Sequence, residues 1–188
     1  MVHMVQNRNI EFEVILALVK NRMHLRELAR AIKVPHSTLL RKLNELFKDG
    51  LIDYKIEGKN KIFFIKNNLS AKNYVYSAEF YKLNKLLKRH SELAIIFEDI
   101  KKSFPEGMII LFGSYAKDAE KPNSDIDIYL ETTNFRIKDK IKEIYSKLSI
   151  KTGEFNLNSL LVREIIKNHI IISGVEGFYE RINFFKET

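Results

Sequence analysis

Residues 108–128, MIILFGSYAKDAEKPNSDIDI, carry the pattern that decides the fold of the C-terminal part of the chain. Its first five residues form a continuous apolar run, as expected of a buried strand. This run ends at Gly113-Ser114. A polar stretch over residues 118–124 follows, and residues 125–130 then alternate as a second strand. The segment therefore predicts two strands joined by a Gly-Ser turn and a polar loop.

Asp125 and Asp127 stand on the second of these strands. Because side chains alternate along a strand, the two carboxylates project from the same face. Two carboxylates on one face repel each other, and such a pair usually holds a cation. Oxygen ligands alone favour Mg²⁺ or Mn²⁺ over zinc. We therefore predict that both aspartates bind a divalent metal ion.

The Gly-Ser turn points to a phosphate ligand. Gly113 lets the backbone turn sharply after a buried strand and approach a phosphate closely. Ser114 can cap the following helix and offers its hydroxyl and nearby N–H groups to phosphate oxygens. A nucleoside triphosphate held here, with metal on the aspartates, is positioned for in-line attack on its α-phosphate.

The spacing of these residues resembles a known superfamily. Gly-Ser, ten intervening residues and Asp-x-Asp form the signature of polymerase-β-like nucleotidyltransferases. Residues 92–182 are most similar to the minimal nucleotidyltransferases of prokaryotes, among them the antitoxin partners of HEPN toxins. The resemblance implies a mixed β-sheet flanked by helices, an NTP ligand and a possible HEPN-like partner protein. The alternative is a loop closed by structural aspartates.

The resemblance also implies a third carboxylate, on the strand after the next helix. We expect a helix over residues 135–148 and that strand over residues 154–158, which places Asn156 at the matching position. Asn156 offers an oxygen to the metal but no charge, and Glu154 is predicted to complete the catalytic site with the aspartates. Lys117, where relatives have arginine, is predicted to bind nucleotide phosphate, and Asp118 stands where many have glycine.

The N-terminal third shows three helical patterns and then a hairpin. Apolar residues recur at helical spacing from Asn9 to Lys20, over residues 24–32, and from Pro35 to Gly50. Two strand-like segments, 51–56 and 61–65, follow. This order resembles the winged helix-turn-helix domain of archaeal and bacterial regulators. The overall expectation is an α+β chain with a winged helix and a nucleotidyltransferase fold.

The winged-helix resemblance implies that the third helix enters the major groove of double-stranded DNA. Its outward residues and the tip of the hairpin are the predicted DNA contacts: Ser37, Thr38, Arg41, Lys42, Lys59 and Lys61. The charge agrees, because residues 1–68 carry 13 Lys/Arg against 7 Asp/Glu, whereas the remainder carries 19 against 17. A Lys-rich proteome, or a winged helix used for dimerisation or protein contact, remains the alternative.

The composition bounds the other possibilities. Cysteine is absent, which excludes disulfides and thiolate sites and fits a reducing, cytoplasmic location. The longest apolar runs are too short to cross a bilayer, so no membrane association is expected. We predict domains at residues 1–68 and 92–188, joined by a helical connector over 69–91 whose aromatic residues could form a homodimer interface. An archaeal origin fits the pattern.

Two functions remain open from the sequence. In the first, the protein is an Mg²⁺-dependent nucleotidyltransferase that moves NMP from an NTP to an unknown acceptor. In the second, the domain has lost turnover and acts as a nucleotide-binding transcription regulator or an antitoxin-like, partner-binding protein. We expect the first, and the uncharged Asn156 is the main argument for the second.

Overall fold

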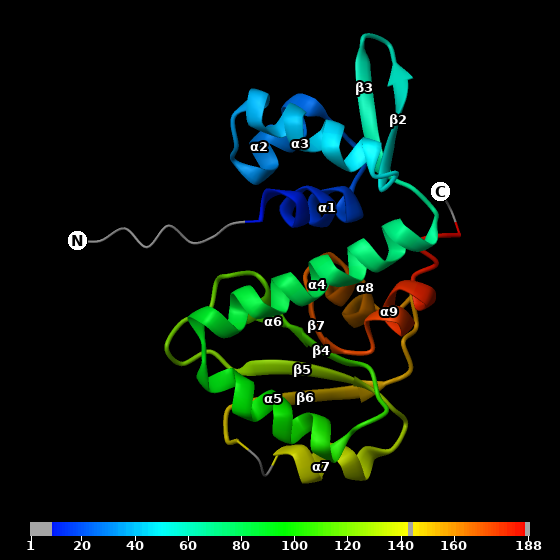
Figure 1. Ribbon diagram of the computed structural model, residues 1–188. Helices are drawn as coiled ribbons and strands as arrows, with labels where there is room; N and C mark the ends of the chain where they lie inside the picture. The colour runs from blue at the N-terminus through cyan, green and yellow to red at the C-terminus, as the bar shows by residue number, and fades with distance from the viewer. Residues whose placement is uncertain (1–8, 143–144, 187–188) are drawn as a thin grey trace, which may run out of the picture. The chain divides into compact units, whose positions relative to one another are not determined.

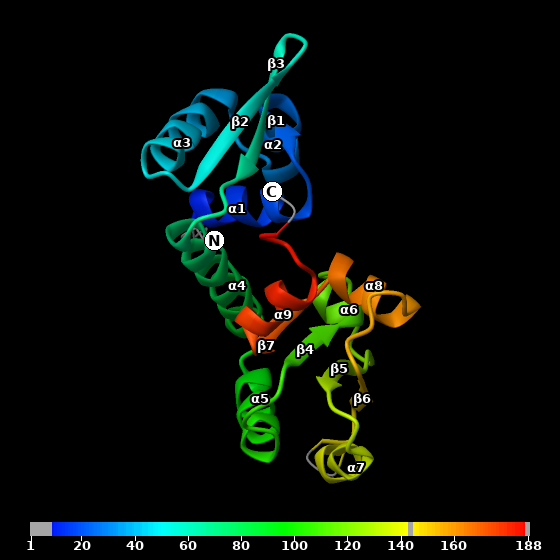
Figure 2. The same ribbon diagram turned by 90° about the vertical axis from the view of Figure 1, so that its right-hand side faces the viewer.

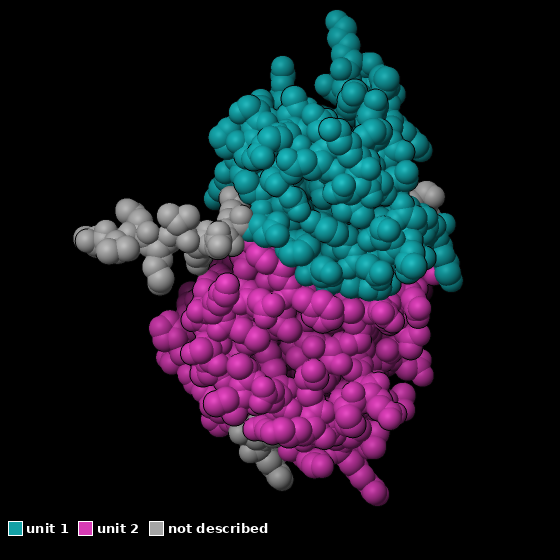
Figure 3. Space-filling model, viewed as in Figure 1, with its two compact units in different colours: residues 1–78, 185–188 teal, residues 79–184 magenta. Residues whose placement is uncertain are grey.

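The computed structural model describes residues 9–142 and 145–186. The chain divides into two compact units, unit 1 with residues 1–78 and 185–188 and unit 2 with residues 79–184 (Figure 3). The division falls inside one helix, α4 (Leu69–Arg89), so each unit contains part of it. Within the described residues, no helix has the length and apolar character needed to cross a membrane.

Unit 1 consists of helices followed by a hairpin, in the predicted order (Figure 1). Its elements are α1 (Ile10–Lys20), β1 (Met23–His24), α2 (Leu25–Ile32), α3 (His36–Lys48), β2 (Ile52–Glu57), β3 (Asn60–Ile65) and the first half of α4. The described strands form an antiparallel sheet in the order β1-β3-β2, of which β1 was not predicted. Apolar residues of all these helices and of β2 and β3 are buried.

The ends of α3 follow from its sequence. The helix begins directly after Pro35, whose missing N–H costs nothing in a first turn. It ends before Gly50, which has φ +70°, a left-handed conformation that side chains with a Cβ rarely adopt. The aromatic Tyr74 of α4 belongs to the same unit, because its hydroxyl donates to Glu11 on α1 at 2.6 Å.

Unit 2 is a mixed sheet flanked by helices, as predicted (Figure 2). Its elements are the second half of α4, α5 (Glu92–Ser103), β4 (Ile109–Phe112), α6 (Gly113–Ala116), β5 (Ile126–Glu131), α7 (Phe135–Lys142), β6 (Leu148–Gly153), α8 (Leu160–Lys167), β7 (Ile170–Ser173) and α9 (Val175–Arg181). The strand order is β6-β5-β4-β7, with β5 and β6 parallel and the other neighbours antiparallel.

The two faces of this sheet differ. Ile126, Ile128 and Leu130 of β5 pack into a buried apolar cluster with residues of α5 and α7. The opposite face carries Asp127, Tyr129 and Glu131, because side chains alternate. Tyr129 is covered there by Phe155, which also contacts Phe178 of α9. The Asp127 end of this face is where the candidate site lies.

The structure corrects the predicted strand over 154–158. The strand after α7 is β6, which ends at Gly153, and the predicted helix over 135–148 stops at Lys142 among the described residues. Leu148 fits both the helical spacing from Ile137 and Ile141 and the strand alternation with Ile150, so periodicity alone was ambiguous. Of the residues predicted to be helical, Leu148 belongs to β6, residues 145–147 lie outside both elements, and residues 143–144 are not among the described residues.

A buried polar cluster joins α4 to the last elements of unit 2. Glu79 is 1% exposed and His169 is 6% exposed. Glu79 accepts hydrogen bonds from the Tyr179 hydroxyl at 2.9 Å and from Lys82 at 3.1 Å. Burial alone would raise the pKa of Glu79, but Lys82, His169 and Tyr179 together lower it to about 2. The carboxylate is therefore stabilised in its charged form inside the unit.

Candidate functional site

The Gly-Ser turn and the aspartates come together at one end of β4 and β5. β4 ends at Phe112, and α6 begins at Gly113, which has φ +71°. A Cβ at Gly113 would lie 2.2 Å from Oδ2 of Asp127 and 3.0 Å from its Cγ. Only glycine fits between the turn and this carboxylate, so the structure places the expected phosphate turn directly against one expected metal ligand.

The two carboxylates differ in exposure. Asp127 is half-buried and pairs in register with Phe112 on β4, whereas Asp125 precedes β5 and is exposed. Magnesium is commonly bound through one or two carboxylates together with substrate phosphates. A pair of aspartates beside a phosphate turn is therefore a donor set that suits one Mg²⁺ or Mn²⁺ ion shared with a nucleotide. Their roles as ligands remain predictions.

Ser149 stands where a third carboxylate was sought. In the parallel pairing of β5 with β6, Asp127 lies opposite Ser149, which is flanked by buried Leu148 and Ile150. Glu154 follows the far end of β6, five residues beyond Ser149, or about 16 Å at the usual rise per residue. The register therefore places Glu154 at the end of the strand away from Asp127, so the prediction that Glu154 completes the site with the aspartates finds no support in the strand pairing.

Residues after the Gly-Ser turn are held by charged partners that the sequence did not reveal. Lys117 Nζ lies 2.6 Å from Oε1 of Glu164 on α8. Asp118, which has φ +54°, pairs with Arg89 at the end of α4. This left-handed conformation is one that glycine adopts without steric cost. The predicted phosphate ligand Lys117 thus already has an anionic partner.

Comparison with known proteins identifies this domain. Residues 93–185 match the nucleotidyltransferase domain family. A solved structure described as a crystal structure of a toxin-antitoxin with AMP-PNP also matches, with 20% identity and a TM-score of 0.33, over 57% of this chain and 86% of the matched chain. A search of curated proteins found no match. The family match supports the nucleotidyltransferase domain predicted from Gly113-Ser114 and the aspartates.

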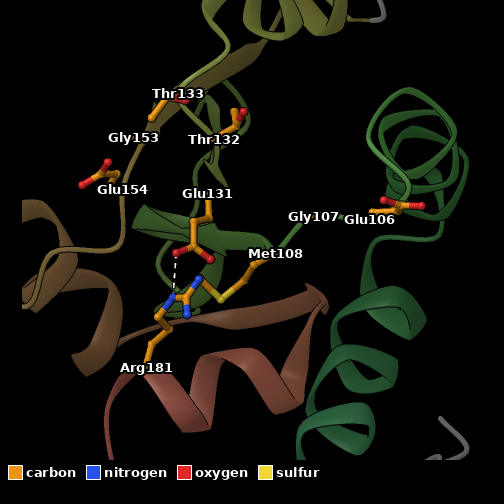
Figure 4. Close-up of a pocket in the computed structure, with 9 residues that line it drawn as sticks. All are labelled: Glu106, Gly107, Met108, Glu131, Thr132, Thr133, Gly153, Glu154 and Arg181. Atoms are coloured by element: carbon orange, nitrogen blue, oxygen red, sulfur yellow. Dashed lines mark hydrogen bonds and ion pairs between the residues drawn. The ribbon is translucent and has the colours of Figure 1, made fainter.

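Within the nucleotidyltransferase domain, Glu154 belongs to a different hollow (Figure 4). It lies there with Glu131 and Arg181, which pair at 2.8 Å, at the end of the sheet away from Asp127. Asn156 instead accepts a hydrogen bond from the backbone N–H of Asn158 in the turn before α8. Among the described residues, no group of three or more acidic, histidine or cysteine side chains could hold a metal ion.

The predicted DNA contacts of unit 1 lie in two places, the hairpin and the helix α3. Lys59 and Lys61 at the hairpin line one hollow with Leu40 of α3 and Arg26 of α2. Ser37 and Arg41 on α3 are exposed, and Thr38 is half-buried. Arg26, which the sequence prediction did not include, lines the same hollow as Lys59 and Lys61.

Lys42 does not lie free on the outward face of α3, as the sequence prediction had it. Its ammonium donates to Glu11 at 2.6 Å and to Glu45 at 2.7 Å. These two carboxylates raise the pKa of Lys42, through hydrogen bonds first and charge second. Lys42 therefore ties α3 to α1.

Proposed function

We propose that the nucleotidyltransferase domain binds a nucleoside triphosphate together with one divalent cation, Mg²⁺ or Mn²⁺. The observation that carries the proposal is the close approach of Gly113 to the Asp127 carboxylate. It joins a turn suited to phosphate oxygens with a carboxylate suited to the cation that neutralises them. Asp125 supplies the second carboxylate, and Ser114 and Lys117 contact the phosphates.

We further propose that the domain acts as a nucleotide sensor with little transfer activity. Transfer needs an acceptor hydroxyl to lose its proton, and a nearby carboxylate is the usual group that receives it or neutralises the site. The position opposite Asp127 holds the uncharged Ser149, and Glu154 lies at the other end of the strand. The bound cation supplies charge neutralisation of the phosphates. Binding is thereby supported better than turnover.

The second candidate is transfer of NMP from the NTP to an acceptor. The match of residues 93–185 to the nucleotidyltransferase domain family favours it. A HEPN-like toxin as the partner protein remains a prediction from the sequence resemblance, and the acceptor is unknown.

One experiment separates the two candidates. The wild type, Asp127→Ala, Ser149→Asp and Ser149→Asn are titrated with each of the four NTPs and Mg²⁺ in a calorimeter. The same proteins are incubated with α-labelled NTP, and label transfer is measured. We expect NTP binding by the wild type, loss of binding in Asp127→Ala, and transfer only in Ser149→Asp. Ser149→Asn controls for size, because it differs from Ser149→Asp only in charge.

The outcomes are distinct. Efficient transfer by the wild type would establish the enzyme and refute the sensor. Absence of NTP binding by a folded wild type would refute both. Equal behaviour of Ser149→Asp and Ser149→Asn would show that the missing charge opposite Asp127 does not limit transfer.

For unit 1 we propose a winged helix that binds double-stranded DNA. Support comes from the basic residues Arg26, Lys59 and Lys61 around one hollow, beside the exposed N-terminal half of α3. Phosphate contacts of this kind make affinity fall steeply with salt. In a gel-shift titration at low salt we expect Arg26→Ala to bind DNA more weakly than wild type.

Arg30→Ala is the matched control, because Arg30 is an exposed arginine of the same helix that lines a different hollow. An equal effect of the two substitutions would show that only net charge matters. Absence of binding to any duplex would favour dimerisation or protein contact instead.

A further inference from the structure

Glu164 forms an ion pair with Lys117, the lysine that is proposed to contact the phosphates of the nucleotide. Its Oε1 lies 2.6 Å from Nζ of Lys117, the first residue after α6. The hydrogen bond and charge of Lys117 lower the pKa of Glu164, so the carboxylate is ionised at neutral pH. Glu164 comes from α8, which precedes β7, the neighbour of β4. An element separate from the Gly-Ser segment therefore supplies an anion to that segment.

The backbone around Lys117 is held independently of this ion pair. Asp118 pairs with Arg89, and Glu120 contacts Nε2 of His90 at 2.8 Å. Within the turn, the backbone N–H of Lys117 donates to the carbonyl of Ser114 at 3.1 Å. Because these contacts fix the loop, Lys117 can change its partner by rotating its side chain, without movement of the backbone.

The Lys117–Glu164 pair is of the kind that exchanges readily. The two side chains are 43% and 42% exposed. Ion pairs with such access to water contribute little, since solvent screens them and ordering two long side chains costs entropy. A phosphate carries more charge than a carboxylate and offers more acceptor oxygens, so it can displace Glu164 at a small but measurable cost.

We propose that Glu164 is a built-in competitor that sets the affinity of the site for the phosphate chain of a nucleotide. The inference rests on the proposed nucleotide binding and adds a specificity-determining residue to it. A phosphate that contacts Lys117 competes with Glu164 for the ammonium and meets the negative charge of that carboxylate, whereas a nucleoside without phosphates does neither. Glu164 thereby lowers affinity for nucleotides selectively and leaves affinity for the nucleoside unchanged.

The test is a double-substitution cycle in calorimetry at low salt. ATP with Mg²⁺, and separately adenosine, are titrated into wild type, Glu164→Gln, Lys117→Met and the double variant. Glu98→Gln is the control, because Glu98 is an exposed glutamate on α5, which packs on the other face of the sheet. Circular dichroism melts verify that each variant is folded.

We expect Glu164→Gln to bind ATP about two- to five-fold more tightly than wild type, the range of an exposed ion pair. The gain should vanish in the Lys117→Met background, shrink at high salt and be absent for adenosine and in Glu98→Gln.

Three results would count against the inference. Unchanged ATP affinity in Glu164→Gln, with ATP binding by wild type, overturns the inference alone. An equal gain in the Lys117→Met background overturns it too, because the effect would then not pass through Lys117. Absence of ATP binding in folded wild type and Glu164→Gln overturns the proposed function and the inference with it.

Discussion

Substitution of Gly113 by alanine tests whether the Gly-Ser turn and Asp127 act as one site. The new Cβ would lie 2.2 Å from Oδ2 of Asp127, against an ordinary contact of 3.4 Å or more, so that oxygen must retreat by about 1.2 Å. Rotation of the carboxylate is not enough, because Cγ and Cβ of Asp127 would also lie at 3.0 and 3.1 Å. Part of β5 must therefore shift.

The expected magnitudes follow from this geometry. Magnesium requires near-ideal octahedral geometry at about 2.0–2.1 Å, so a ligand displaced by about 1 Å no longer reaches it. We expect Gly113→Ala to lose about ten-fold or more of its Mg²⁺-dependent ATP affinity, the range seen when the support of a metal ligand is removed. The left-handed backbone adds about 1–2 kcal/mol of destabilisation.

The control separates the displaced carboxylate from backbone strain. Gly50 has φ +70°, almost the same as Gly113 at +71°, but a Cβ there meets nothing within 4 Å. Gly50→Ala should therefore lose similar stability in a urea melt and keep its ATP affinity. Calorimetric titration with Mg²⁺ and with EDTA measures the metal-dependent part. Wild-type ATP affinity in a folded Gly113→Ala would refute the reasoning.

Three further substitutions follow from the structure. Glu79 has a folded pKa of about 2 against the ordinary 4.5, so its stabilisation is present above pH 4.5 and is lost as the pH falls towards 2. Urea melts across that range should show that Glu79→Gln loses about 3 kcal/mol less free energy of unfolding than wild type does. An identical pH dependence in the two proteins would contradict the buried charge. Lys33 ends α2 at φ +52°, so Lys33→Gly should raise the free energy of unfolding by about 0.5–1 kcal/mol, and a lower urea midpoint would show that the αL position is not strained. Lys42→Ala should leave DNA affinity in a gel shift nearly unchanged, because Glu11 and Glu45 already neutralise Lys42. A loss of DNA affinity as large as that of Arg26→Ala would show that Lys42 contacts the DNA.

The elements that local periodicity marks clearly were predictable from the sequence. The helices of unit 1, the hairpin and β5 show a clear period, and β4 a continuous apolar run, and their bounds agree with the structure within a few residues. A shared site for the Gly-Ser turn and the aspartates was also expected, and the antiparallel pairing of β4 with β5 explains why Asp127 lies against Gly113. Local chemistry was sufficient there.

The third position of the site was not predictable, because it depends on strand register. Leu148-Ser149-Ile150 and Phe155-Asn156-Leu157 both place a polar residue between apolar ones. Only the pairing of Asp127 with Ser149 decides which of them lies beside the aspartates. Contacts between distant segments, such as Lys117 with Glu164 and Lys42 with Glu11, likewise leave no mark in local sequence.

The helix shared by the two units has a practical consequence for dissecting the protein. A fragment starting at residue 92, near the start of the family match, would lack Glu79 and Leu86. Tyr179 would then lose its hydrogen-bond acceptor, and the buried apolar cluster under the sheet would lose the side chain of Leu86. At the other end, Asn67 donates to the carbonyl of Phe185, which belongs to unit 1. In domain topology, residues 79–184 are thus an insertion into unit 1. A fragment of unit 2 that keeps α4 whole would begin at Leu69 and so include ten residues of unit 1.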